Sequence, residues 1–158
     1  MTASKNKIKT FKRLSILRRL WAWEGKTVVF TNGVFDILHA GHADILERAR
    51  ALGDILIVGV NSDASARRLG KGKGRPVNRL RDRAALLAGL SSVDAVVAFS
   101  EDTPQKLLSK LKPDILVKGA DYRADEIAGA ACAGKVVRLA LKKGYSTTAL
   151  IRRLQGKT

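Results

Sequence analysis

Short runs of Val, Ile and Leu alternate along this chain with segments of helical periodicity. The expected strands are residues 27–31, 55–60, 95–99, 114–118 and 135–139. Runs built almost wholly of these residues are buried on both faces of a sheet, and helices between them make neighbouring strands parallel. The pattern therefore predicts an α/β fold with a doubly wound, mostly parallel five-stranded sheet. Ligands of such a sheet bind at the carboxyl ends of its strands.

Helices are expected between these strands. They cover residues 43–52, 79–90 and 103–111, and a last one covers residues 149–154. Asn78 is the expected N-cap of the second helix, and Thr103 before Pro104 is a typical helix start.

The first 25 residues differ from the rest of the chain. A polar, basic stretch is followed by Phe11, Leu14, Leu17 and Trp21 at helical spacing. We therefore divide the chain into a basic N-terminal segment with an amphipathic helix, residues 1–25, and a domain of residues 26–158. The apolar stripe is expected to pack on the domain or on a second subunit, and a membrane-surface helix is the alternative.

The chain is strongly basic. Thirty Lys and Arg residues against fourteen Asp and Glu residues give a formal net charge of +16, so an anionic partner is expected. The charge gathers in residues 1–26 and 67–83, which a solvated face would also explain. In the second run, glycines alternate with Lys71 and Lys73, as in a mobile basic loop that closes over a phosphate.

Several classes of protein are disfavoured by simple counts. No apolar run reaches membrane-spanning length, and no signal peptide is visible, so membrane insertion is not expected. The single cysteine, Cys132, cannot form an internal disulfide, which fits a reducing cytoplasm. Aromatic residues make up 5% of the chain and none lies within the basic run of residues 67–83, so no stacking platform for nucleic acid is expected.

The two histidines of the chain, His39 and His42, flank Gly41 just after the first expected strand. A strand-to-helix turn of this kind offers free backbone N–H groups, and Gly41 allows close approach of the backbone to a ligand. Phosphoryl and nucleotidyl transfer require donors aimed at the charge that develops on phosphate oxygens. The two imidazoles can supply such donors.

These motifs carry a resemblance to a known family. Residues 27–63 run from Thr-Val-Val-Phe-Thr-Asn-Gly through His-Ala-Gly-His to Val-Gly-Val-Asn-Ser-Asp and resemble the cytidylyltransferase-like nucleotidyltransferase superfamily, with its Rossmann-like fold. They are most similar to the adenylyltransferase domains of bacterial heptose 1-phosphate enzymes, which make ADP-heptose for lipopolysaccharide. The similarity continues through residues 75–78, 101–105, 116–122 and 144–148, and covers roughly residues 26–154.

The resemblance implies a reaction and its catalytic residues. A sugar 1-phosphate would attack the α-phosphate of ATP, pyrophosphate would leave, and no covalent enzyme intermediate would form. His39 and His42 would stabilise the pentacoordinate phosphate. Lys71 or Lys73 would reach the triphosphate, with Lys71 placed in the catalytic set, and Arg83 resembles the phosphate-contacting arginine of the superfamily.

The nucleotide is expected to contact the strand ends and the last helix. Its expected ligands are Thr31, Asn32, Gly33, Phe35, Gly41, Arg83, Lys118, Gly119, Asp121, Ser146, Thr147 and Thr148. The hydroxyls and N–H groups of residues 146–148 suit β- and γ-phosphates, although a structural cap is the alternative. An ordinary surface ion pair is the alternative for Lys118 and Asp121.

The acceptor is expected to contact other strand ends. Asp36, Asn61 and Asp63 are candidates for the sugar hydroxyls, although either Asp could instead cap its local turn. Leu141 stands where related glycerol-phosphate cytidylyltransferases have an arginine, which favours ATP over CTP.

The remaining expectations concern partners. The family's domains are often fused to a sugar kinase, so this chain would be a stand-alone adenylyltransferase fed by a separate kinase. We expect Mg²⁺ bound through the triphosphate and a homodimer. The alternatives are a cytidylyltransferase acting on glycerol 3-phosphate or another polyol phosphate, and a basic nucleic-acid-binding module.

Overall fold

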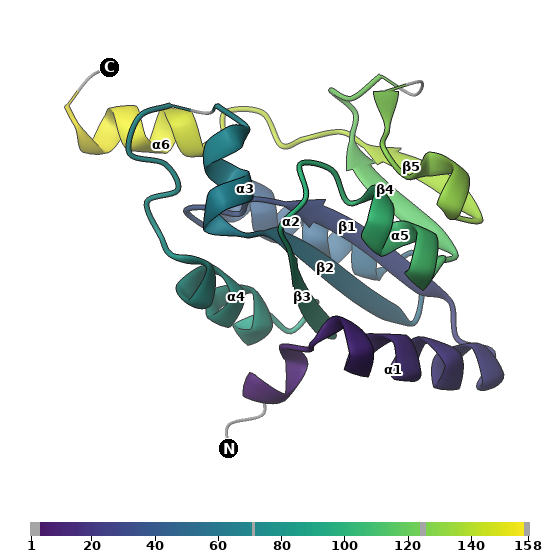
Figure 1. The fold of residues 1–158 in the computed structure, drawn as a ribbon. Coiled ribbons are helices and arrows are strands. Elements are labelled where there is room, and N and C mark those ends of the chain that lie inside the picture. Colours follow the sequence, from purple (N-terminus) through teal and green to yellow (C-terminus); the bar gives the residue numbers. More distant parts are fainter. Residues whose placement is uncertain (1–3, 71, 124–125, 157–158) are drawn as a thin grey trace.

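Five parallel strands form the single sheet of this computed structural model, which describes residues 4–70, 72–123 and 126–156 (Figure 1). The strands are β1 (Val28–Gly33), β2 (Ile55–Asn61), β3 (Ala95–Phe99), β4 (Ile115–Gly119) and β5 (Lys135–Leu139). Their order across the sheet is β3-β2-β1-β4-β5, and each neighbouring pair is parallel. The prediction of a parallel five-stranded α/β sheet is confirmed.

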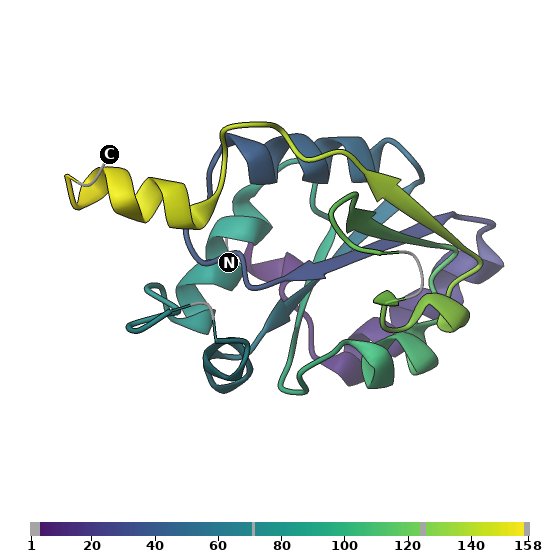
Figure 2. The ribbon, with the colours of Figure 1, turned by 90° about the horizontal axis from the view of Figure 1, so that it is seen from above.

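Helices cover both faces of this sheet (Figures 1 and 2). The α-helices are α1 (Phe11–Trp23), α2 (Ala40–Arg50), α3 (Asp63–Arg68), α4 (Leu80–Gly89), α5 (Gln105–Leu111) and α6 (Thr147–Leu154), and the short 3-10 helices are η1 (Lys5–Lys7) and η3 (Ala130–Cys132). Apolar side chains of α2 and α4 pack on one face of the sheet, and those of α1 and α5 pack on the other. Successive residues of β1 alternate between these layers, Val29 in the first and Phe30 in the second. The sheet is doubly wound.

The strand order places a crevice at the end of β1. The chain leaves β1 for β2 and β3 on one side and then returns to place β4 on the other side. The connections after β1 and β4 therefore diverge, and ligands of open α/β sheets bind at such a switch point.

Helix α1 packs directly on the sheet. Leu14 is fully buried, and Phe11 and Trp21 pack against the same apolar cluster. Arg18 Nη2 donates to Asp114 Oδ1 over 3.2 Å, and Asp114 Oδ2 accepts from the N–H of Val28 over 2.7 Å. Three residues of the apolar stripe expected in the N-terminal segment thus pack on the domain, and Leu14 belongs to its core.

Some expected helix bounds are wrong. Helix α2 begins at Ala40, so His39 is its N-cap residue. Helix α4 begins after Arg79, and the prediction that Asn78 caps it is wrong, because the Asn78 amide instead donates to the carbonyl of Asp36 over 2.7 Å. Helix α3 was not expected; Ser62 caps it by accepting from a backbone N–H. None of the helices in the described ranges combines the length and apolar character needed to cross a bilayer.

Candidate active site

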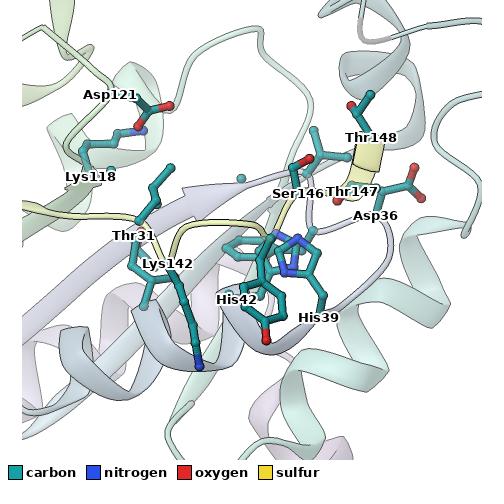
Figure 3. A pocket seen from close by; sticks show the side chains of 18 of the residues that line it. Thr31, Asp36, His39, His42, Lys118, Asp121, Lys142, Ser146, Thr147 and Thr148 are labelled. Carbon is teal, nitrogen blue, oxygen red and sulfur yellow. The ribbon is translucent and has the colours of Figure 1, made fainter. Parts of the chain in front are cut away.

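A cavity of about 300 Å³ lies at the switch point (Figure 3). Its walls are the ends of β1 and β4, the start of α2 and the segment leading into α6. Fourteen of the expected site residues line it: Thr31, Asn32, Gly33, Phe35, Asp36, His39, Gly41, His42, Lys118, Gly119, Asp121, Ser146, Thr147 and Thr148. Segments that are far apart in the sequence therefore meet where the sheet topology predicts a ligand.

The two histidines form a stacked pair at the start of α2. Their ring centroids lie 3.8 Å apart and the ring planes are inclined by 17°. Burial lowers the pKa of His39 below its ordinary value. A Cβ atom at Gly41 would lie 2.8 Å from Cβ of Tyr145 and 3.1 Å from the His39 ring, so this position excludes a larger residue. The close packing holds both imidazoles against the cavity.

Phe35 supports this pair from the loop after β1. Its φ of 49° lies in the left-handed region, which a bulky residue rarely adopts. The Phe35 ring meets the His42 ring edge-on, with centroids 5.2 Å apart and planes at 62°. A Cβ atom at Gly33 would come within 3.2 Å of the Phe35 ring, which explains the small residue at the end of β1.

Lys118 lies at the opposite end of the cavity from Asp36 (Figure 3). It is 6% exposed, and its Nζ donates to Asn32 Oδ1 over 2.5 Å. Burial lowers the pKa of Lys118 to about 8, although the charge of Asp121 acts in the other direction. The alternative of an ordinary surface ion pair fails for so buried a lysine. A Cβ atom at Gly119, the last residue of β4, would collide with the Asp121 carboxylate, so a larger residue there would displace the Asp121 side chain.

The start of α6 closes the other end of the cavity. Ser146 Oγ accepts from the N–H of Ala149 over 3.0 Å and is the N-cap of the helix. Thr147 and Thr148 form the first turn, where backbone N–H groups lack intrahelical acceptors. Such a turn attracts anions through its N–H groups and the helix dipole.

Asp36 lies beside Thr147 and Thr148 in Figure 3. It is 1% exposed, and its Oδ1 accepts from the N–H of Asn78 over 2.9 Å. Burial raises the pKa of this carboxyl, but hydrogen bonds from two backbone N–H groups and from Arg75 outweigh burial, so the pKa lies below its ordinary value. Asp36 is therefore ionised and already bound to protein donors.

Arg75 was not among the expected site residues, although it lines the cavity. Its Nε donates to Asp36 Oδ2 over 3.1 Å and its Nη1 donates to Thr148 Oγ1 over 3.4 Å. The motif of residues 75–78 pointed to this segment, but the many basic residues nearby gave no reason to choose Arg75. Tyr122, Leu141, Lys142 and Tyr145 also line the cavity.

Three expected ligands lie outside the cavity lining. Arg83 is fully buried, and its guanidinium donates to the carbonyls of Val34, Asn61 and Asn78 and to the Asp63 carboxylate. These bonds engage the Arg83 guanidinium with backbone carbonyls at the ends of β1 and β2 and before α4, and Arg83 does not line the cavity. Asn61 and Asp63 are likewise engaged: the Asn61 amide donates to Ser65 Oγ over 2.9 Å, and Asp63 Oδ1 accepts from the N–H of Leu80 over 2.8 Å.

The proposed triphosphate loop is described only in part. Lys71 lies outside the described residues. Lys73 is exposed and does not line the cavity. The two lysines remain candidates for contact with the triphosphate.

The fold and this constellation define a class of protein. The chain matches the family Cytidylyltransferase-like over residues 30–153 and belongs to it. The prediction of a nucleotidyltransferase is confirmed by this match and by the relatives.

Particular relatives narrow the comparison. The chain is 56% identical over 137 residues to the bifunctional protein HldE of Shewanella sp. (strain ANA-3), covering 84% of this chain and 29% of that protein. It is 54% identical over 144 residues to HldE of Helicobacter pylori, covering 91% of this chain and 31% of the relative. The chain thus spans about a third or less of these proteins.

A solved structure shows the same arrangement. The lipopolysaccharide core biosynthesis protein of Thermoplasma volcanium GSS1 is 34% identical, with a TM-score of 0.65. The match covers 75% of this chain and all of that chain.

Proposed function

We propose that this chain transfers AMP from ATP to D-glycero-β-D-manno-heptose 1-phosphate, giving ADP-heptose and pyrophosphate for lipopolysaccharide core synthesis. The observation that carries the proposal is the stacked pair of His39 and His42 in a cavity whose lining also includes Arg75, beside the first turn of α6, and Lys118. The similarity to HldE proteins and to a lipopolysaccharide core biosynthesis protein supports the sugar substrate.

The cavity suits an in-line displacement at phosphorus. A phosphate oxygen of the sugar 1-phosphate forms the new bond to the α-phosphorus, and the bond to the bridging oxygen breaks as pyrophosphate leaves. His39 and His42 donate N–H groups to the α-phosphate oxygens, where negative charge develops. The first turn of α6 binds the departing phosphates, and Mg²⁺ enters on the triphosphate, whose oxygens are ligands it prefers.

The base is proposed to lie at the Lys118 end of the cavity. Leu141 packs against Gly119 there, since a Cβ atom on the glycine would lie 3.2 Å from a methyl group of Leu141. An apolar residue at this point offers no donor to the carbonyl oxygen of cytosine. This supports ATP as the donor nucleotide.

We also propose a cytoplasmic homodimer that does not bind nucleic acid. Large apolar side chains remain exposed on two helices, with Trp23 of α1 85% exposed and Leu154 of α6 74% exposed. Burying such side chains in a subunit interface would be favourable. Sedimentation at several protein concentrations tests the dimer, and a gel shift at physiological salt tests nucleic-acid binding.

A pyrophosphate-release assay tests the reaction. ATP and CTP are each combined with β-heptose 1-phosphate and with glycerol 3-phosphate, and products are identified by chromatography. We expect ADP-heptose, with roughly 100-fold preference for ATP in kcat/KM, because the wrong base leaves buried polar groups unpaired. A CDP-linked product in preference would contradict the nucleotide, and comparable turnover of glycerol 3-phosphate would contradict the acceptor.

A further inference from the structure

Arg75 connects two walls of the cavity that no strand or helix joins. It belongs to the segment between α3 and α4, and its guanidinium lies between Asp36, after β1, and Thr148, in the first turn of α6. All three residues line the same cavity. The Arg75 side chain is 11% exposed and that of Asp36 is fully buried.

Asp36 fixes the orientation of this guanidinium. Nε of Arg75 donates to Asp36 Oδ2 over 3.1 Å, and the N–H of Asn78 holds the other carboxylate oxygen at 2.9 Å. An arginine that gives its Nε to a carboxylate keeps the N–H groups of Nη1 and Nη2 for other acceptors. Asp36 thus orients the guanidinium so that Nη1 and Nη2 point away from the carboxylate.

Nη1 and Nη2 have N–H groups that are available to a ligand. The bond from Nη1 to Thr148 Oγ1 is long, at 3.4 Å, and Nη2 has no acceptor among the described residues. A long bond to a neutral hydroxyl is readily replaced by a shorter, charge-assisted bond to a phosphate oxygen.

The neighbouring start of α6 also has hydrogen-bond donors without protein acceptors in the part of the chain that the structure describes. The N–H groups of Thr147 and Thr148 lack intrahelical acceptors, and the helix dipole adds partial positive charge. The carboxylate of Asp36 is already engaged by Arg75 and Asn78. Positive charge and free donors therefore converge on one end of the cavity, and a polyanion would satisfy both.

We infer that Arg75 is a further phosphate-binding residue of this site and that Asp36 is the positioning residue that aims it. Arg75 donates from Nη1 and Nη2 to the pyrophosphoryl group that the first turn of α6 also binds. In this assignment the Asp36 carboxylate binds Arg75 and does not bind the sugar hydroxyls. The inference rests on the proposed nucleotidyl transfer for its ligand.

Calorimetric titration with inorganic pyrophosphate tests this assignment without turnover. Arg75→Gln is expected to weaken pyrophosphate binding roughly 10- to 100-fold, the range for losing a charge-assisted hydrogen bond. Arg75→Lys keeps the charge and loses the fork, so an intermediate affinity is expected. Asp36→Asn leaves Arg75 in place and is expected to weaken binding several-fold.

Two controls distinguish loss of phosphate binding from a general loss of charge or of the folded cavity. Arg81→Ala removes an exposed arginine of α4 outside the cavity lining and is expected to leave pyrophosphate affinity unchanged. Adenosine, which lacks phosphate, is expected to bind wild type and Arg75→Gln equally. Because Arg75 acts on the triphosphate, Arg75→Gln raises KM for ATP, and Arg75→Lys restores part of it.

The outcomes are distinct. Wild-type pyrophosphate affinity in Arg75→Gln, an equal loss of adenosine and pyrophosphate binding, or a wild-type protein that does not bind pyrophosphate would each overturn the assignment. Loss of pyrophosphate binding in Arg75→Gln, with no nucleotidyl transfer by wild type to any sugar phosphate, would leave Arg75 assigned and contradict the proposed function.

Discussion

His39 and His42 lie face to face, with ring centroids 3.8 Å apart. Two imidazoles at this distance repel each other if both are protonated, and burial already lowers the pKa of His39. A neutral imidazole still donates one N–H. The pair can therefore offer donors to a phosphate at neutral pH without carrying two positive charges.

Replacing either histidine with alanine is expected to lower kcat at least about 100-fold while ATP affinity changes only a few-fold. The reason is that these donors matter most when charge develops in the transition state. Steady-state kinetics and ATP titration check this, with Arg81→Ala as the matched control. Near-normal kcat in either variant would remove that histidine from the mechanism.

The lowered pKa of His39 predicts a pH effect on stability. Its ordinary value is 6.5, so the unfolded chain binds a proton on this residue at a higher pH than the folded protein does. The free energy of unfolding should therefore fall as pH drops through about 6.5 and level off below the folded-state pKa. Urea unfolding at pH 7.5 and pH 5 should show a smaller fall in His39→Asn. Equal falls in both proteins would argue against this burial effect.

Lys118 predicts a pH effect on binding. With a pKa of about 8 it is protonated at pH 7 and loses its charge as pH rises further. Wild-type affinity for ATP should fall between pH 7.5 and pH 9, because a neutral amine donates weaker hydrogen bonds to the nucleotide than the charged ammonium group does. Lys118→Gln should bind ATP weakly at both values and show little of this fall.

The same shift has the opposite sign for stability. The unfolded chain keeps the Lys118 proton up to its ordinary pKa of 10.5, so the free energy of unfolding should rise as pH increases through about 8. Parallel binding and unfolding measurements on wild type and Lys118→Gln therefore test one group in two ways. Binding and stability that fall together above pH 8 would contradict the assignment.

Ser146→Ala removes the cap of α6 and should cost about 1 kcal/mol of helix stability. Because no side chain of α6 is buried, the effect should be local. Hydrogen exchange should become faster in residues 147–154, and KM for ATP should rise. Ser109→Ala, a serine within α5 that caps no helix, serves as the control. Unchanged exchange in α6 would show that the cap bond contributes little.

Strands β1 to β4 were predictable because burial on both faces leaves a strong apolar signal, whereas the edge strand β5 is only half-buried and was predictable from Val136, Val137 and Leu139. The bounds of β3 and β5 agree with those expected. Strand β1 extends two residues further, through Asn32 and Gly33, which pair with Gly59 and Val60 of β2. Those two residues line the cavity and are not large apolar residues, so the apolar pattern could not show that they belong to the strand.

The site was predictable where a short motif carries it and not where distant contacts do. The histidine pair and residues 146–148 were found from local patterns. The role of Asn78 depends on Asp36, 42 positions away, and Arg75 depends on Asp36 and Thr148 together. A buried position for Arg83 likewise follows from carbonyls at the ends of β1 and β2 and in the segment before α4, which no local pattern specifies.

The packing of α1 on the sheet determines where the chain can be truncated. Leu14 fills a place in the apolar layer made by Val97, Leu107 and Leu108, so this helix forms one wall of the interior. A chain that begins at Lys26 would expose this apolar layer to solvent. Proteins with a large exposed apolar surface associate with one another. We expect such a fragment to precipitate on expression, whereas a cut ahead of Ile8 would keep α1, its Thr10 cap and the bridge from Ile8 to Val96.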